Sequence, residues 1–386
     1  MRKLLSVGAA AIMIAPLSSQ AVEFKFNGFV KAEVIHSDAA VGSFGDTYTH
    51  TAISRANRVD TTPPEAKKYE KSSATSLQTS QSRFGFQVIQ DKTTGYFEFD
   101  LIDPNAGFTN TTALQAQGPR TRQAFISHKV DDSLTVFIGQ KWSTAAGIAW
   151  VGSYNIVGNG YQAGKVVFLN EEVGATYKLG NLSFTGAITG KGRNAGAINE
   201  NELGTQPGLA GNIEHKTEKF LLGVAGHVSK LHWDETNSAA SGLRDREAYV
   251  AKAYGSATFG SFKWDLEGYM GTNVNNLNAL GIAQASNGTS SWKESGFWTN
   301  LTYDISKLDV MRLGYGMAQV DDEQESRLAA TGLQDNQYIH ANYGRTIGNG
   351  LTAFVQYTYH DTKYGTGSTQ KSFQANVGQA GLLYKF

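Results

Sequence analysis

Charged side chains alternate with apolar side chains in several segments, which places them on one face of each expected strand. The basic residues on these polar faces are Arg83, Arg120, Arg122, Lys141 and Arg312, and acidic ones include Glu98 and Asp100. A wall that carries guanidinium and ammonium groups attracts anions from water. Because three of the arginines face two carboxylates on neighbouring segments, ion pairing with Glu98 and Asp100 is an interpretation that also stays open.

Patterns for catalysis or metal binding are weak. The eight histidines show no HxH or HExxH spacing and the chain has no cysteine, so no metal site and no cofactor are expected. The glycine pairs at 158–160 and 190–192 lack the rest of a phosphate-binding motif and are interpreted as turns. A serine and an inward-facing His340 could form a hydrolase inside a barrel, but no local pattern marks a nucleophile.

The composition limits the class of protein further. The 386 residues carry 34 basic and 34 acidic side chains, so the formal net charge is zero and a dedicated nucleic-acid-binding protein is not expected. After the N-terminus no run of about 18 apolar residues occurs, which excludes helical membrane spans. Aromatic residues are plentiful and only 18% of the chain is charged, which argues against disorder.

Residues 1–21 have the pattern of a signal peptide. Arg2 and Lys3 precede an apolar run, and small residues at Ser19 and Ala21 suit a signal peptidase. We expect cleavage after Ala21 and export of residues 22–386 as a single domain. The alternative, a membrane anchor helix, is disfavoured because the apolar run is short and contains Pro16.

Polar and apolar residues alternate with a period of two through most of residues 22–386. Segments of about ten residues are joined in turn by very short links and by long polar stretches, the first of which is 38–76. This rhythm predicts an all-β fold, an antiparallel transmembrane β-barrel with short periplasmic turns and long extracellular loops. We expect about sixteen strands, at approximately 23–37, 77–90, 95–103, 119–130, 134–142, 165–178, 182–191, 207–216, 219–232, 246–259, 261–272, 294–305, 308–319, 335–347, 350–361 and 372–386.

The C-terminal segment carries the most specific local signal. Phe386 shares one strand face with Tyr384 and Leu382. A terminal Phe with apolar residues at alternate positions before it resembles the strand that the outer-membrane assembly machinery recognises. The alternative is an ordinary edge strand that ends in Phe by chance.

Taken together, the signal peptide, the rhythm of strands and loops, and the terminal Phe resemble the general porins of Gram-negative bacteria. Three shorter stretches, Ser82–Phe86, Arg122–Phe125 and Gly139–Thr144, are similar to the pattern of DcaP-type porins. That resemblance implies a homotrimer of 16-stranded barrels whose basic constriction handles dicarboxylates and similar anions. It also implies that Arg83 and Arg122 line the pore.

The third long loop, residues 143–164, corresponds to the loop that enters the lumen of general porins and sets the bore. It contains no Asp, Glu, Lys or Arg, but it carries Trp150, Tyr154 and Tyr161. We expect this loop to enter the lumen and to present aromatic and amide groups. Without acids opposite the arginines, the local field should be positive. The alternative is a small neutral loop that stays outside.

These observations predict an outer-membrane porin that catalyses no reaction. It would form a water-filled passive diffusion channel for small hydrophilic solutes, with a preference for anions such as dicarboxylates. Its other partners would be the lipid and lipopolysaccharide of the outer membrane. The alternative is a barrel with a plugged lumen that serves as a surface interaction protein, such as an adhesin or a phage receptor.

Overall fold

The computed structural model describes residues 21–39, 73–101, 119–148, 150–155, 160–166, 169–190, 202–205, 207–233, 245–277, 281–282, 291–321, 333–364 and 371–386. The expected signal peptide, apart from Ala21, and most of the first loop 38–76 lie outside these described residues. Within the described ranges no helix has the length and apolar character needed to cross a membrane.

One antiparallel sheet contains all the strands of the described residues. The elements are β1 (Glu23–Ser37), β2 (Ala74–Gln78), β3 (Arg83–Gln90), β4 (Thr93–Asp100), β5 (Arg120–Lys129), β6 (Leu134–Trp142), β7 (Leu169–Leu179), β8 (Leu182–Thr189), β9 (Glu202–Thr205), β10 (Gly208–Lys216), β11 (Phe220–Trp233), β12 (Asp245–Phe259), β13 (Phe262–Thr272), the 3-10 helix η1 (Val274–Leu277), β14 (Lys293–Asp304), β15 (Asp309–Val320), β16 (Leu333–Gly348), β17 (Leu351–Tyr364) and β18 (Lys371–Lys385).

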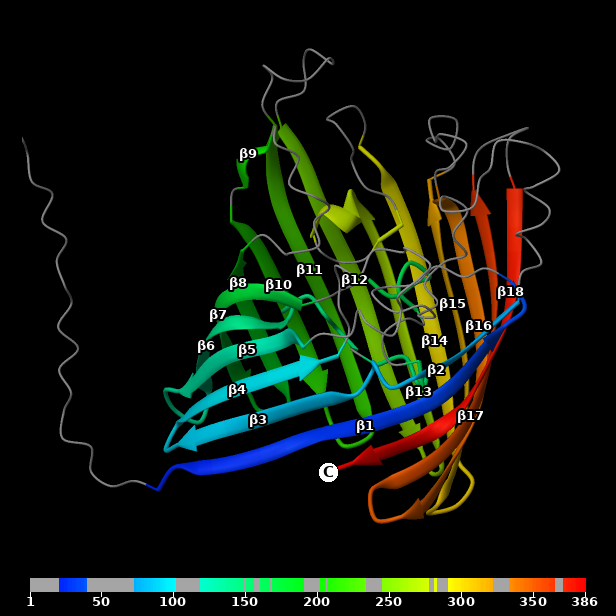
Figure 1. The fold of residues 1–386 in the computed structure, drawn as a ribbon. Helices are drawn as coiled ribbons and strands as arrows, with labels where there is room; N and C mark the ends of the chain where they lie inside the picture. The colour runs from blue at the N-terminus through cyan, green and yellow to red at the C-terminus, as the bar shows by residue number, and fades with distance from the viewer. Residues whose placement is uncertain are drawn as a thin grey trace, which may run out of the picture.

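The sheet closes on itself because β1 pairs with β18, from Phe29 opposite Lys385 to Ser37 opposite Val377. In Figure 1 the C-terminus accordingly lies beside β1. β2 and β3 both pair with β1, and β9 and β10 both pair with β11, so each of these pairs occupies one position in the wall. The eighteen strands therefore form a closed barrel of sixteen wall positions, and the predicted fold class is confirmed.

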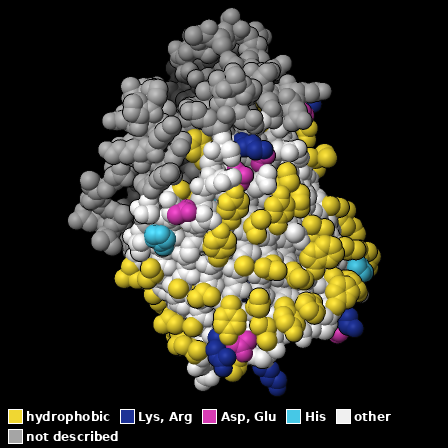
Figure 2. Space-filling model, turned by 90° about the vertical axis from the view of Figure 1, so that its right-hand side faces the viewer, with side chains coloured by type: hydrophobic (Ala, Val, Ile, Leu, Met, Phe, Trp, Pro, Cys, Tyr) yellow, Lys and Arg dark blue, Asp and Glu magenta, His cyan; other side chains and the backbone are white. Residues whose placement is uncertain are grey.

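The period of two decides which side chains face outward. In β1, Val30 and Val34 are 41% and 47% exposed, whereas Lys31 and Glu33 between them are buried. The same alternation in the other strands gives the barrel an apolar outer wall, which Figure 2 shows as a broad field of hydrophobic side chains with charged groups near its lower edge. The polar faces point inward, which is the arrangement of a barrel between lipid and water.

The short links are present where the sequence predicts them. Gly180, Gly260 and Gly350 adopt positive φ angles of 58°, 58° and 76° in three of the turns, which glycine does without steric cost. In the short link between the strands expected at 207–216 and 219–232, the amide of Thr217 donates to the carbonyl of Phe220 at 2.8 Å.

Three expected strands differ from the structure. The segment predicted at 77–90 is interrupted at residues 79–82, where the Ser82 hydroxyl accepts a hydrogen bond from the Lys31 amide at 3.0 Å and replaces a backbone ladder bond. The segment predicted at 207–216 has an additional part, β9, before it. The strand predicted from residue 165 begins at Leu169 because Lys165 belongs to the preceding loop, where its amide bonds the carbonyl of Gly160.

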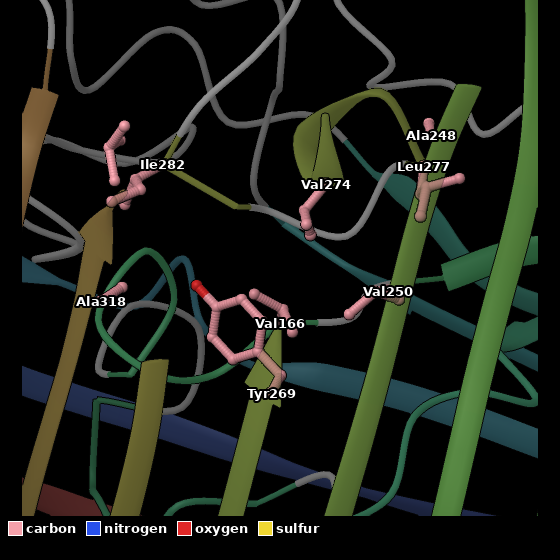
Figure 3. Packing of buried hydrophobic residues seen from close by; sticks show 9 residues of the cluster. Val166, Ala248, Val250, Tyr269, Val274, Leu277, Ile282 and Ala318 are labelled. Atoms are coloured by element: carbon pink, nitrogen blue, oxygen red, sulfur yellow. The ribbon is translucent and has the colours of Figure 1, made fainter. Parts of the chain in front are cut away.

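One side of the interior contains a packed apolar cluster. Val274 and Leu277 of η1 and Ile282 pack against inward-facing residues of β12, β13 and β15, including Val250 and Tyr269. Figure 3 shows Val166, from the end of the 143–164 loop region, beside Tyr269 in the same cluster. The sequence predicts an outer loop between the expected strands 261–272 and 294–305, but the described first part of this connection instead turns inward against the wall.

Candidate functional site

Arg120 and Arg122 of β5 face the carboxylates of β4 inside the barrel. Arg120 makes a bidentate pair with Asp100, with Nε–Oδ1 and Nη2–Oδ2 distances of 3.0 and 2.5 Å. Arg122 Nε lies 2.9 Å from Glu98 Oε1, and its Nη1 lies 3.0 Å from Asp100 Oδ2. The Asp100 and Arg122 side chains are almost fully buried. Of the two open interpretations, ion pairing therefore holds for these two arginines.

A β-bulge in β5 makes this cluster possible. Glu98 pairs with Gln123 and Phe99 pairs with Thr121, so Arg122 is the additional residue on the bulged strand. A bulge redirects side chains that strict alternation would place elsewhere. Here it allows the buried Arg122 to reach Glu98 and Asp100 together.

Arg83 and Arg312 face inward and make no ion pair with a carboxylate among the described residues. Arg83 lies between Phe29 of β1 and Asp100 of β4 in the sheet, with its Cζ 5.7 Å from the Phe29 ring centroid, and its Nε has no hydrogen-bond partner among the described residues. Arg312 of β15 donates from Nη1 to Asn342 Oδ1 at 3.2 Å, and its Nε is also without a partner. Around Arg83, the three guanidinium groups of Arg83, Arg120 and Arg122 exceed the two carboxylates of Glu98 and Asp100 by one charge, and Arg312 adds a second excess positive charge on β15.

Lys141 of β6 is opposed by Glu172, a buried acid on the neighbouring strand β7. Its Nζ lies 3.7 Å from Glu172 Oε2 and 4.3 Å from the ring centroid of Phe137. The Glu172 carboxylate accepts hydrogen bonds from the amide and hydroxyl of Thr144, at 2.8 and 2.7 Å. Lys141 therefore contributes less net positive field than the sequence suggests, because Glu172 is close.

The described part of the 143–164 loop lies against inward-facing side chains on the opposite wall. The Tyr154 amide donates to Gln356 Oε1 of β17 at 2.7 Å, and Asn342 Nδ2 of β16 donates to the Gly152 carbonyl at 2.8 Å. The Tyr154 ring stacks on Phe354, with ring centroids 4.3 Å apart. Since the loop leaves the wall at β6, these contacts place its tip across the lumen.

The aromatic residues expected at the constriction have different surroundings. Trp150 is 42% exposed and donates from Nε1 to the Ser153 carbonyl at 3.1 Å. Tyr154 and Tyr161 are buried. Burial raises the pKa of Tyr161 to about 12, although Arg122 and Arg83 act in the opposite direction, so its hydroxyl stays neutral at physiological pH.

The two ends of the loop are held by an ion cluster that sequence reasoning missed. We call Lys165, Lys252 and Glu267 the root cluster. Lys252 Nζ lies 3.1 Å from Glu267 Oε1, and Lys165 Nζ lies 3.3 Å from Glu267 Oε2. Lys252 also donates to the carbonyls of Ala146 and Val166, at 3.1 and 2.7 Å. Both ends of the loop are thereby joined to β12 and β13.

The three residues of the root cluster are buried. Burial lowers the pKa of Lys165, and Glu267 acts in the opposite direction. The only signal in the sequence is that Glu267 lies on the polar face of its strand. Its lysine partners come from a loop and another strand, so a periodic pattern does not identify them.

The C-terminal residues complete the wall. The Phe386 amide donates to the Gly28 carbonyl at 3.2 Å, and the Gly28 amide donates back to the Phe386 carbonyl at 3.3 Å. Leu382 and Tyr384 are 46% exposed on the outer face. The three residues thus share the outer face, as the sequence predicts, while their role as an assembly signal stays a prediction.

His340, the histidine considered for a hydrolase, is buried in β16 and stacks on Tyr338 with ring centroids 5.7 Å apart. In the part of the chain that the structure describes, no group of three or more His, Asp or Glu side chains is placed to hold a metal ion.

These features define a closed β-barrel with an apolar outer wall, a polar inner wall and a loop that crosses the lumen, which is the fold of the bacterial outer-membrane porins. The outer-membrane channel DcaP of Acinetobacter baumannii superposes with a TM-score of 0.70 at 16% identity, over 95% of this chain and 97% of that one.

Two further solved structures share the fold. An anion-selective porin from Comamonas acidovorans gives a TM-score of 0.58 at 10% identity, over 95% of this chain and 100% of that chain. The trimer form of OmpT from Vibrio cholerae gives 0.57 at 15% identity, with the same coverage. No protein-family model and no curated protein sequence matches the chain.

Proposed function

We propose that this protein is an outer-membrane porin, a passive and non-catalytic channel for small hydrophilic solutes that prefers anions. The observation that carries the proposal is the pair of inward-facing arginines, Arg83 and Arg312, that make no ion pair with a carboxylate among the described residues. The described part of the 143–164 loop adds no acidic group to oppose them. A positive lumen raises the local concentration of anions.

The likeness to other barrels supports the same proposal. DcaP is named as an outer membrane channel, and the Comamonas protein is named as an anion-selective porin. Dicarboxylates are the solutes we propose, because the family resemblance implies them. The broad apolar outer wall supports the proposal that outer-membrane lipid and lipopolysaccharide surround the barrel.

We also propose that the protein assembles as a homotrimer, by analogy with the trimeric OmpT barrel. Chemical cross-linking of the protein in mild detergent should give a band at three times the monomer mass. If only the monomer band appears after cross-linking, the trimer is ruled out and the channel proposal is unaffected.

The channel function is tested by recording the purified protein in planar bilayers under a salt gradient. We expect steady conductance steps and a reversal potential of the sign that anion flow produces. A reversal potential of zero, or of the sign that cation flow produces, would exclude the anion preference. A panel of dicarboxylates should then reduce the ion current as each solute occupies the bore.

A second candidate function has one observation in its favour. The apolar cluster around Tyr269 and Val274 fills part of the interior, as it would in a plugged barrel that serves as an adhesin or phage receptor. The same recording separates the two candidates, because a plugged barrel gives no steady conductance steps.

A further inference from the structure

Gln356 lies at the point where the 143–164 loop meets the far wall. Its side chain points inward from β17 and is buried. The Oε1 atom accepts hydrogen bonds from the Ser153 hydroxyl at 3.0 Å and from the Tyr154 amide at 2.7 Å. The Nε2 atom donates to Gln379 Oε1 at 2.8 Å and to Thr358 Oγ1 at 3.2 Å. One amide thus joins two consecutive loop residues to two wall strands.

The tip has further contacts around this point. Asn342 Nδ2 donates to the Gly152 carbonyl, and it also lies 3.4 Å from Gln356 Oε1. Gln81, in the break between β2 and β3, donates to Asn155 Oδ1 at 2.9 Å. Gly152 has a φ of +74°, and an added Cβ would lie 2.2 Å from Asn300 Oδ1, so the loop backbone fits closely against the wall.

We propose that Gln356 is the positioning residue that holds the loop tip across the lumen and thereby sets the bore of the channel. This inference rests on the proposed channel function. Removing a buried hydrogen-bonding group leaves its partners unsatisfied, so the Tyr154 amide and the Ser153 hydroxyl would have to find water. The root cluster would still hold both ends of the loop, so the tip would move and the barrel wall would stay in place.

The position of Trp150 follows from the same contact. Trp150 lies a few residues before Ser153 and Tyr154, and its ring faces the guanidinium of Arg312 with 4.9 Å between Cζ and the ring centroid. Tyr154 also faces Arg312, at 5.3 Å. Release of the tip from Gln356 would therefore withdraw both rings from Arg312 and expose Trp150 further to water.

The test compares Gln356→Met with a matched control, Gln379→Met. Gln379 is the register partner of Gln356 in β18 and is also inward-facing and buried, but within the described residues its side chain hydrogen-bonds to Gln356 and Glu33 and not to the loop. We expect Gln356→Met to raise single-channel conductance by about twofold, because a displaced loop widens the constriction. Gln379→Met should leave conductance near the wild-type value.

A second measurement reports loop position without relying on conduction. The fluorescence of Trp150 is obtained by subtracting the spectrum of the same protein with Trp150→Phe. Quenching of this fluorescence by acrylamide should increase in Gln356→Met and not in Gln379→Met. Gln356→Glu keeps the accepting oxygen, so it should restore both readouts toward the wild type. If Gln356→Met does not fold, Ser153→Ala removes one of the two loop contacts from the loop side and should shift both readouts in the same direction.

The outcomes separate this inference from the channel function. If Gln356→Met and Gln379→Met have the same single-channel conductance and the same quenching of Trp150 fluorescence, the positioning role is overturned while the channel function stands. If the wild-type protein forms no conducting steps, the channel function and the bore-setting role both fail. In that case the quenching comparison still decides whether Gln356 positions the loop.

Discussion

The guanidinium of Arg312 lies over the indole of Trp150, with 4.9 Å between the Arg312 Cζ and the ring centroid. A cation over an aromatic face is held in place without losing its charge. A carboxylate partner would neutralise that charge, as Asp100 does for Arg120. The aromatic loop residue therefore orients Arg312 and leaves its positive field available to a passing solute.

Replacing Arg312 by Ala should reduce the anion-over-cation permeability ratio roughly twofold, because one uncompensated charge is removed from the lumen. The reversal potential in a salt gradient measures this ratio. Arg312→Lys keeps the charge and is the matched control, so it should retain most of the preference. Equal reversal potentials for the wild type and Arg312→Ala would contradict the assignment.

Replacing Arg122 by Met should destabilise the barrel. The substitution removes one partner of a buried ion cluster and leaves Glu98 and Asp100 with a single arginine, which typically costs about 3–5 kcal/mol. Urea unfolding in lipid vesicles, followed by tryptophan fluorescence, measures the free energy of unfolding. The double variant Arg122→Met/Glu98→Gln should recover part of the loss. An unfolding curve that matches the wild type would show that the cluster adds nothing to stability.

Gly139 should not tolerate a side chain. It has a φ of +129°, and an added Cβ would lie 2.3 Å from the carbonyl oxygen of Ala124 on β5. Gly139→Ala should therefore lower the free energy of unfolding by about 1–3 kcal/mol through backbone strain. Gly186→Ala is the control, since an added Cβ there meets no atom within 4 Å. Similar losses in both variants would argue against a local cause at Gly139.

Replacing Phe386 by Ala should slow barrel assembly. The Phe386 ring lies 6.0 Å from Phe84 and 6.3 Å from Tyr384, centroid to centroid, and both contacts are lost in the variant. The fraction of heat-modifiable, folded protein in isolated outer membranes measures assembly. Phe259→Ala removes another exposed aromatic side chain and should have a smaller effect. Equal folded fractions for Phe386→Ala and Phe259→Ala would contradict a specific role of Phe386 in assembly.

Asp131 should titrate below its ordinary range. The amides of Leu134 and Ser133 donate to its carboxylate and lower its pKa from 3.8. Because the folded-state pKa is the lower one, the stabilising effect on this turn is complete above the unfolded value and is lost as pH falls through the folded value. An NMR titration of the Asp131 side-chain carbonyl carbon locates the midpoint, and a midpoint at or above 3.8 would contradict the turn geometry.

Alternation of side chains made the wall predictable. The inward positions of Arg83, Lys141 and Arg312 follow from the period of two, because a strand between lipid and water has two chemically different faces. The ion pairs of Arg122 were not decidable from the sequence. They depend on the inter-strand register and on the bulge opposite Glu98, and neither can be read from the alternation of residues in the sequence.

The interior was less predictable than the wall. Lys165, Lys252 and Glu267 come from a loop and two strands, and only the closed barrel brings them together. The inward turn of Val274 was likewise missed, since a stretch between strands has no periodicity to show where it packs. Such contacts depend on the three-dimensional closure of the sheet.

Because β1 pairs with β18, the barrel can close only after the last strand of the chain is in place. Until the last strand arrives, both the first strand and the growing edge offer unpaired amides and carbonyls to any neighbouring chain. A chain that lacks its final strand cannot close the sheet and keeps two unpaired strand edges. Truncated copies are therefore expected to associate with other chains through these edges, whereas full-length chains close the barrel and pair them.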